Sequence, residues 1–163
     1  MAKSMTQKAN QLLQRAHIMT LATASETGPW AAAVYYVPHK TGLYFFSNPD
    51  SRHIREGLAG GVAVTIQETP FHFSEIEGFQ MEGTIEKAGV RKGSSAAFTQ
   101  YIKRFGFLDE LFSGDALKNL ENFLAKEKKP AWYRFTPSSI WYVDNSSGFG
   151  KRMDIALEDL FSL

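Results

Sequence analysis

The residues best suited to chemistry in this sequence lie in one short segment. The apolar run Leu43–Phe46 ends at Ser47–Asn48–Pro49–Asp50, and Ser51, Arg52 and His53 come next. Backbone N–H groups at the start of a helix attract anions, and a guanidinium grips a phosphate with two parallel hydrogen bonds. The hydroxyls of Ser47 and Ser51 would add further donors. If a helix begins here, the segment predicts an anion site at a strand-to-helix turn.

A plainer interpretation of the same segment is a surface helix with an ordinary cap. Asp and Ser are favoured N-cap residues, so Asp50 or Ser51 would cap a helix whose first polar residues face water. The residue types by themselves leave both interpretations open.

Other candidate motifs carry less chemistry. Gly148–Lys151 fails as a phosphate loop, because its glycines are wrongly spaced and Arg152 follows where Ser or Thr is required. The four histidines show no metal-binding spacing, and no Ser–His–Asp arrangement is recognisable. We therefore assign no metal ligand and no catalytic residue.

Hydrophobic periodicity predicts the elements that would position the anion site. Helices are expected after the N-cap Ser4, over Ser51–Leu58, around residues 96–105 and after Asp115. Strands are expected over residues 18–25, 30–38, 43–46, 61–68 and 76–88, and as one or two strands over 131–145 interrupted at Pro137. Within the fifth strand, Gly78 and Gly83 are expected at a bulge or a close backbone approach. Short antiparallel strands with late helices predict an α+β fold around a small split β-barrel of about six strands.

Composition bounds the kind of protein. The 163 residues suit a single domain over 1–163, and 44% of them are hydrophobic, which favours a packed core. A net charge of +1 argues against a nucleic-acid binder. The chain has no cysteine, its N-terminus lacks the apolar core of a signal peptide, and its longest apolar run is too short to span a bilayer. We expect a soluble cytoplasmic protein with no membrane partner.

In their order along the chain these segments resemble the FMN-binding split barrel of the pyridoxamine 5′-phosphate oxidase-like superfamily. The resemblance runs from "WAAAVYYVPHKTGLYFFSN" through "SRHIREG", "GVAVTIQE" and "GFQMEGTIEKA" to "WYRFTPSSIWYVDN". The ending "DNSSGFGKRM" is similar to that of a less characterised bacterial branch, which also has Arg-His at the phosphate position.

The resemblance implies FMN as the cofactor and a set of residues that hold it. The phosphate would lie against Phe46, Ser47, Asn48, Ser51, Arg52 and His53. The backbone of Ala32, Ala33, Val34 and Tyr35 would follow the isoalloxazine edge, where the small side chains of Ala31–Ala33 permit close approach. Gln80 matches a family glutamine that reaches the flavin.

The resemblance also implies a homodimer with the cofactor at its interface. Trp141 and Lys151 are our candidates to reach the partner's flavin. An excess of aromatic residues beyond what a small barrel can bury points the same way, and these are Phe71, Phe73, Phe79, Trp141 and Phe149. The alternative for Trp141 and Lys151 is a core residue and a solvated tail.

The chain departs from true pyridoxamine phosphate oxidases at its end. Those enzymes bind the substrate phosphate with Arg-Leu-His-Asp-Arg, whereas Leu157–Leu163 is "LEDLFSL". Pyridoxamine phosphate is therefore not the expected substrate. The leading hypothesis is an FMN-dependent oxidoreductase acting on a small-molecule substrate or electron donor. The alternatives are a deazaflavin enzyme and a non-catalytic module that holds flavin or haem for storage or sensing.

Overall fold

The computed structural model describes residues 4–40, 42–89, 95–105 and 130–161. Its strands form one antiparallel sheet in the order β2-β1-β5-β6-β7-β4-β3, and β8 pairs with β7. The strands are β1 (Ile18–Ser25), β2 (Gly28–Tyr35), β3 (Val37–His39), β4 (Gly42–Ser47), β5 (Val62–Gln67), β6 (Glu77–Lys87), β7 (Ala131–Asp144) and β8 (Arg152–Asp154). The helices are α1 (Met5–Arg15), α2 (Arg52–Ala59), α3 (Ser95–Arg104) and α6 (Leu157–Phe161), with single 3-10 turns η1 (Phe73–Glu75) and η2 (Asn145–Ser147).

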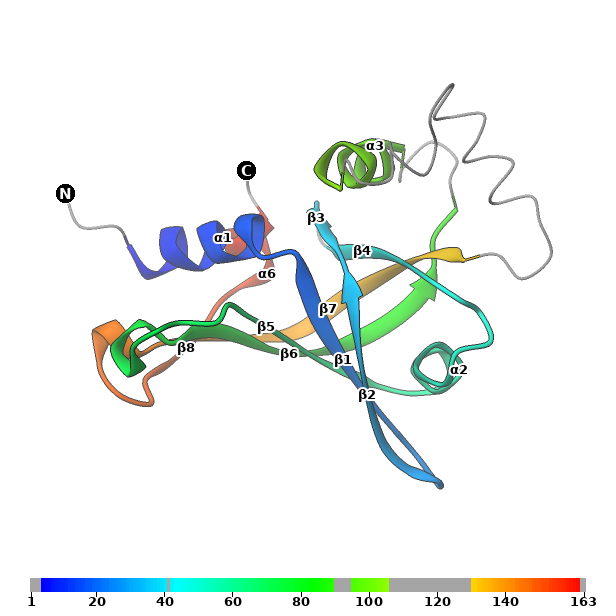
Figure 1. Cartoon of the computed structure of the whole chain (residues 1–163), viewed down its shortest axis with the longest axis horizontal. Helices are drawn as coiled ribbons and strands as arrows, with labels where there is room; N and C mark the ends of the chain where they lie inside the picture. The colour runs from blue at the N-terminus through cyan, green and yellow to red at the C-terminus, as the bar shows by residue number, and fades with distance from the viewer. Residues whose placement is uncertain (1–3, 41, 90–94, 106–129, 162–163) are drawn as a thin grey trace.

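Figure 1 shows a strongly curled sheet, with the β1–β2 hairpin crossing the long β6–β7 ribbon and the helices at the periphery. This is the expected α+β split barrel. Among the described residues it has eight strands rather than about six. The strand expected over residues 30–38 divides into β2 and β3, and β8, of three residues, is too short to show a period of two. The helix expected after Asp115 lies outside the described residues. Among the described helices, none is long and apolar enough to cross a membrane.

Local sequence explains how the chain enters the sheet. The Ser4 hydroxyl accepts from the backbone N–H of Gln7, and the Gln7 side chain accepts from the backbone N–H of Ser4, so a capping box starts α1. One face of α1 is buried in the main core together with β1, β5, β6 and β7. A second, smaller core joins α3 to β3, β4 and β7 through Phe98, Tyr101 and Trp132.

Two strand predictions were wrong, each for a local reason. Residues 30–38 do not form one strand, because the chain breaks at Tyr36, whose ring is buried and whose hydroxyl donates to the Leu13 carbonyl at 2.8 Å. Pro137 does not interrupt β7, which runs through it. Pro137 pairs with Gly83 where the register shifts between Glu82 and Gly83, and such an irregularity is where a strand accepts proline.

The expected close approach at Gly83 is confirmed. A Cβ added there would lie 2.2 Å from the Thr136 carbonyl oxygen, which leaves space for glycine alone. Gly78 is also tight, with the Ile66 carbonyl 3.0 Å from such a Cβ. Glycine at these positions lets β6 lie close to its neighbours and so fixes the curvature of the sheet.

A buried carboxylate fastens α1 to the end of β7, and its removal is expected to lower stability. Burial would raise the pKa of Asp144, but hydrogen bonds from Lys8, Ser146 and Ser147 outweigh it and lower that pKa to about 2. The ionised form is thus favoured by folding, so its contribution is present above the unfolded pKa of 3.8 and is lost as pH falls through about 2. Asp144→Asn should lower the free energy of unfolding by about 2 kcal/mol at pH 7 and by much less at pH 2.

Urea denaturation at the two pH values measures this difference. Glu68→Gln is the matched control, because the Glu68 carboxylate pairs with Arg15 at an exposed site, where ion pairs contribute little. Equal losses at both pH values would show that the Asp144 charge does not stabilise the fold.

Candidate functional site

The structure brings Ser47, Ser51 and His53 together at the turn between β4 and α2. The Ser47 Oγ lies 2.7 Å from the His53 Nε2, and the Ser51 Oγ lies 3.3 Å from each of these atoms. Desolvation by burial lowers the pKa of His53, so its imidazole is neutral at neutral pH. We call Ser47, Ser51, Arg52 and His53 the anion site.

The turn before α2 leaves the start of the helix open. Ser51 occupies the N-cap position, but its side chain caps no backbone N–H. Instead its hydroxyl donates to the Asn48 carbonyl at 2.7 Å, while the Asn48 side chain accepts from the backbone N–H of Asp50 at 2.9 Å. The positive end of α2 is therefore available to an anion. This arrangement fits the anion-site interpretation better than that of a capped surface helix.

Three contacts hold the Arg52 side chain of the anion site. Its Nε donates to the Glu56 carboxylate at 2.7 Å, and its Nη2 donates to the Gly28 carbonyl at 2.8 Å. The guanidinium carbon also lies 4.9 Å from the centre of the Trp30 ring. Two of the five guanidinium N–H groups are used by these hydrogen bonds, which leaves donors for a ligand.

The strand β2, whose backbone is expected to lie along the flavin ring, is at an edge of the sheet. Within the described residues, β2 pairs only with β1, so its other side presents backbone donors and acceptors. Ala31, Ala33 and Tyr35 are exposed, and Ala32 and Val34 are partly buried. β2 also approaches β4, which ends at the anion site. The anion site and the exposed edge of β2 therefore belong to elements that lie close together.

Phe46, which was also expected to lie against the phosphate, is a packing residue of the second core. Its ring packs among other aromatic rings, with centroids 4.5 Å from Trp132 and 5.3 Å from Tyr101. It is only partly exposed, and it anchors the end of β4 to the second core. Phe46 thus fixes where Ser47 points.

Gln80 and Trp141 lie next to each other, outside the anion site. They are cross-strand partners on β6 and β7, and both line a groove of about 380 Å³ on the face of the sheet. We call this the sheet groove. It is lined by Thr20, Ala22, Ala63, Val64, Thr65, Gln80, Met81, Glu82, Trp141 and Arg152. Among the described residues, the sheet groove and the anion site share no member.

Arg152 was missed by the sequence analysis, which chose its neighbour. The Lys151 side chain folds over its own turn, with its Cδ 3.2 Å from where a Cβ of Gly148 would lie, and Lys151 is not among the groove residues. Arg152 lies on β8 and reaches the groove. Recognising β8 as a strand would have found it, since the face of a strand alternates from one residue to the next.

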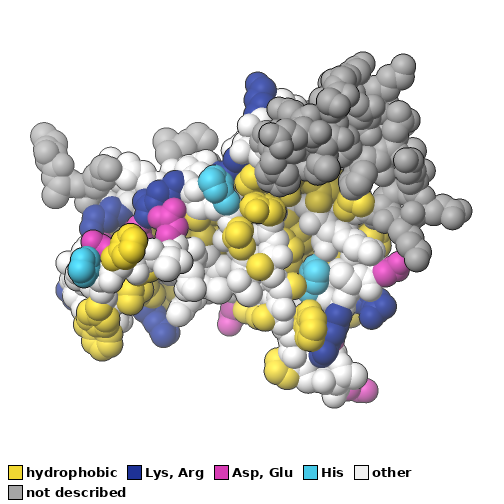
Figure 2. Space-filling model, in the orientation of Figure 1, with side chains coloured by type: hydrophobic (Ala, Val, Ile, Leu, Met, Phe, Trp, Pro, Cys, Tyr) yellow, Lys and Arg dark blue, Asp and Glu magenta, His cyan; other side chains and the backbone are white. Residues whose placement is uncertain are grey.

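The prediction of surplus exposed aromatic residues holds for four of the five. Phe71, Phe73, Trp141 and Phe149 are exposed, and the Phe73 and Phe149 rings lie 5.0 Å apart. Phe79 is fully buried against Tyr142, so its inclusion was wrong. It faces the core because its neighbours Gly78 and Gln80 take the opposite side of β6. Figure 2 shows hydrophobic side chains at the surface on the end of the molecule that carries β8 in Figure 1.

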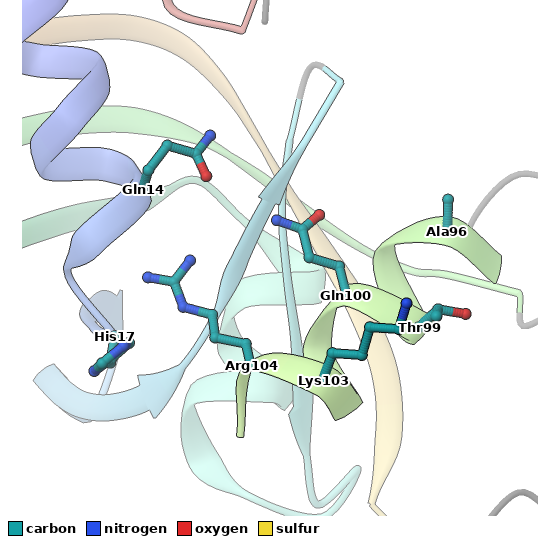
Figure 3. A pocket seen from close by; sticks show the side chains of 7 residues that line it. All are labelled: Gln14, His17, Ala96, Thr99, Gln100, Lys103 and Arg104. Carbon is teal, nitrogen blue, oxygen red and sulfur yellow. The ribbon is translucent and has the colours of Figure 1, made fainter. Parts of the chain in front are cut away.

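A larger cavity, of about 790 Å³, lies between the end of α1 and α3. Figure 3 shows the side chains of Gln100 and Arg104 on α3 extending toward Gln14. The lining residues that the structure describes are Gln14, His17, Ala96, Thr99, Gln100, Lys103 and Arg104, and of these two are cationic and none is acidic. The Arg104 guanidinium also donates to the Ala16 carbonyl at 2.5 Å. The lining suits ligands that carry an anionic group.

Comparisons with known proteins find both similar sequences and similar solved structures. A UPF0306 protein of Enterobacter sp. (strain 638) is 27% identical over 147 residues, which cover 88% of this chain and 91% of the relative. The haem-binding protein of Mycobacterium smegmatis superposes with a TM-score of 0.70 at 16% identity, over 99% of this chain and 62% of that chain. An FAD-binding protein of Mesorhizobium loti superposes with a TM-score of 0.60 at 17% identity, over 83% of this chain and 91% of that chain.

These structural likenesses establish the split-barrel fold, and a family model establishes the family. The model described as pyridoxamine 5′-phosphate oxidase matches residues 5–144, which include the anion site, the β2 edge, Gln80 and Trp141. The chain belongs to the pyridoxamine 5′-phosphate oxidase family.

Proposed function

We propose that this protein binds FMN and acts as a flavin-dependent oxidoreductase on a small molecule other than pyridoxamine phosphate. The observation that carries the proposal is the open start of α2 with Ser47, Ser51 and Arg52 around it, close to the exposed edge of β2. The family match supports it, and so does the flavin that the Mesorhizobium loti neighbour binds.

The chain's own residues have distinct tasks in this proposal. Ser47 and the first backbone N–H groups of α2 donate to the phosphate, and Arg52 supplies the charge. The Ser51 hydroxyl joins them when it turns its one proton from the Asn48 carbonyl to the phosphate. The edge of β2 orients the ring through its backbone groups, and the alanines allow close contact. FMN, when bound, supplies the redox chemistry, and the protein sets its position and polarity.

We further propose that the cofactor site is completed by a second copy of the chain. The anion site and the sheet groove lie on separate parts of one chain, although Gln80, Trp141 and Arg152 offer a polar, an aromatic and a cationic contact to a flavin. The exposed Trp141, Phe71 and Phe149 would be covered in such a dimer.

The bound flavin is expected to be FMN rather than FAD. The anion site is one compact cluster, with the Ser47 and Ser51 hydroxyls 3.3 Å apart, which suits a single phosphate, and the sequence has no Gly-x-Gly-x-x-Gly turn for a dinucleotide. Heating the purified protein and separating the released flavin by chromatography should give FMN as the dominant species. Release of FAD as the main flavin would contradict this prediction.

Haem binding is the second candidate, and the Mycobacterium smegmatis neighbour favours it. In that case the protein would be a storage or sensing module without redox catalysis of its own. The absorbance spectrum of the purified protein separates the two, because a flavin gives two bands in the near-ultraviolet and blue, whereas haem gives one intense Soret band.

A further inference from the structure

The contacts around Arg52 assign a role to a residue outside the anion site. We propose that Glu56 is a positioning residue, which holds the Arg52 guanidinium so that its remaining N–H groups face the phosphate of the flavin. This inference rests on the proposed function. It concerns a carboxylate one helical turn beyond Arg52, where sequence alone suggests an ordinary surface ion pair.

Glu56 is fixed far more firmly than a surface partner would be. Its Oε2 accepts from the Thr23 hydroxyl at 2.6 Å, and its Oε1 accepts from the Ser25 hydroxyl at 2.7 Å as well as from the Arg52 Nε at 2.7 Å. Both hydroxyls belong to β1, so the carboxylate is held by a different element of the fold. The Glu56 side chain is 11% exposed, against 30% for Arg52.

These donors also keep Glu56 ionised. Hydrogen bonds from Thr23, Arg52 and Ser25, in that order, lower the pKa of Glu56 to about 2. The carboxylate is therefore ionised, and an acceptor for Arg52, at neutral pH. An exposed ion pair within one helix would lack these additional contacts and would contribute little.

The side of the guanidinium that Glu56 contacts decides which N–H groups remain for a ligand. Glu56 engages the Nε side of the guanidinium and Gly28 engages Nη2, so three N–H groups on Nη1 and Nη2 remain for a ligand. Trp30 lies 4.9 Å from the guanidinium carbon and restricts its plane. An arginine held in this way loses little side-chain freedom when the phosphate binds, and a preorganised contact is a stronger one.

Two effects of the Glu56 charge oppose each other. A carboxylate near a phosphate repels it, and removal of Glu56 by this effect alone would tighten binding. Immobilising a long side chain when a ligand binds lowers the affinity by about tenfold. Glu56 already immobilises the Arg52 side chain before FMN binds, so binding avoids this loss. Because three donors already compensate the carboxylate, we expect positioning to outweigh repulsion.

The test compares two flavins that differ only in the phosphate. Glu56→Ala should weaken FMN binding by about tenfold and leave riboflavin binding unchanged, since riboflavin makes no use of Arg52. Glu56→Gln keeps a carbonyl acceptor for the Arg52 Nε and should retain FMN affinity within about threefold. Glu26→Ala is the matched control, because Glu26 is an exposed acid at the turn of the β1–β2 hairpin, whose Thr23 and Ser25 hold Glu56.

Several results would overturn the proposal. Tighter FMN binding in Glu56→Ala or Glu56→Gln would show that the carboxylate repels the phosphate. An equal loss for FMN and riboflavin would show a general structural role. The pair Arg52→Ala and Arg52→Ala/Glu56→Ala should bind FMN equally, and a further loss in the double variant would show that Glu56 does not act through Arg52. If Glu56→Ala does not fold, the FMN affinity of Glu56→Gln tests the proposal. An affinity within about threefold of wild type supports it, and tighter binding overturns it.

A measurement without flavin separates this inference from the proposed function. In ¹⁵N NMR spectra of the cofactor-free protein, the Arg52 Nε–H should give a resolved, slowly exchanging signal because it donates to Glu56. The signal should disappear in Glu56→Ala and persist in Glu26→Ala. A signal unaffected by Glu56→Ala overturns the positioning role, whereas a wild-type protein that binds neither flavin overturns the proposed function instead.

Discussion

Arg52→Ala is expected to weaken FMN binding by about one to two orders of magnitude. A hydrogen bond to a charged group contributes roughly 1.5–3 kcal/mol, which corresponds to this range of dissociation constants. The guanidinium is partly buried and restrained by Glu56, Gly28 and Trp30, so little of its interaction with a phosphate is lost to disorder. Titrating cofactor-free protein with FMN, followed by flavin fluorescence, measures the change.

Arg55→Ala is the matched control for Arg52→Ala. Arg55 lies on the same helix with an exposed side chain, so its removal changes the net charge equally without touching the anion site. FMN affinity should change by less than about threefold in Arg55→Ala at physiological salt. Equal affinities of wild type and Arg52→Ala would return the segment to an ordinary helix start on the surface.

The anion site illustrates how much of a site sequence can predict. Ser51, Arg52 and His53 are adjacent in sequence, and the apolar run before them predicts the strand that ends at Ser47. The local geometry follows from short-range rules, so the sequence predicts the site's location. Glu56 was not found, because its partners Thr23 and Ser25 come from a strand about thirty residues earlier.

The sheet groove shows where sequence reasoning stops. Gln80 and Trp141 were proposed from a resemblance, and nothing in their spacing indicates that they are cross-strand partners. Strand pairing depends on the register of β6 with β7, which the sequence of neither strand specifies, although an irregularity at Gly83 was itself expected. The structure places Arg152 rather than Lys151 in the groove, which the sequence does not indicate, since only the pairing of β8 with β7 decides which side chain faces it.

Burial of individual aromatic residues was also only partly predictable. Phe71 and Phe73 precede β6 and stay exposed, whereas Phe79 within β6 faces the core. A count of aromatic residues cannot distinguish them, because the count ignores the alternation of faces along the strand. Pro137 shows the converse, since a residue that normally ends a strand is accepted opposite Gly83 at the irregular register.

Mixing two defective variants should restore FMN binding if the cofactor site is shared between two chains, and this is the largest effect we expect. Arg52→Ala damages the anion site, and Trp141→Ala/Arg152→Ala damages the sheet groove, so each variant alone should bind FMN about a hundredfold more weakly than wild type. A mixed dimer would contain one site built from the intact anion site of one chain and the intact groove of the other. Since each contact occurs twice in a two-fold dimer, random mixing should restore about a quarter of all sites to wild-type affinity.

The experiment is read after unfolding and refolding the two variants together in equal amounts, by counting the tight sites in an FMN titration. The control mixes wild type with a chain that carries all three substitutions, since every site of that mixed dimer lacks one half and tight sites should be lost rather than gained. Sedimentation at micromolar concentration should show a dimer in each sample. If the groove belonged to the same chain's site, mixing would restore nothing, because each chain would still carry the damaged part of its own site. If the groove played no part in binding, Trp141→Ala/Arg152→Ala would bind FMN like wild type before any mixing. A monomer that binds FMN tightly would likewise refute the shared site, and it would assign Gln80, Trp141 and Arg152 to some other contact of the sheet face.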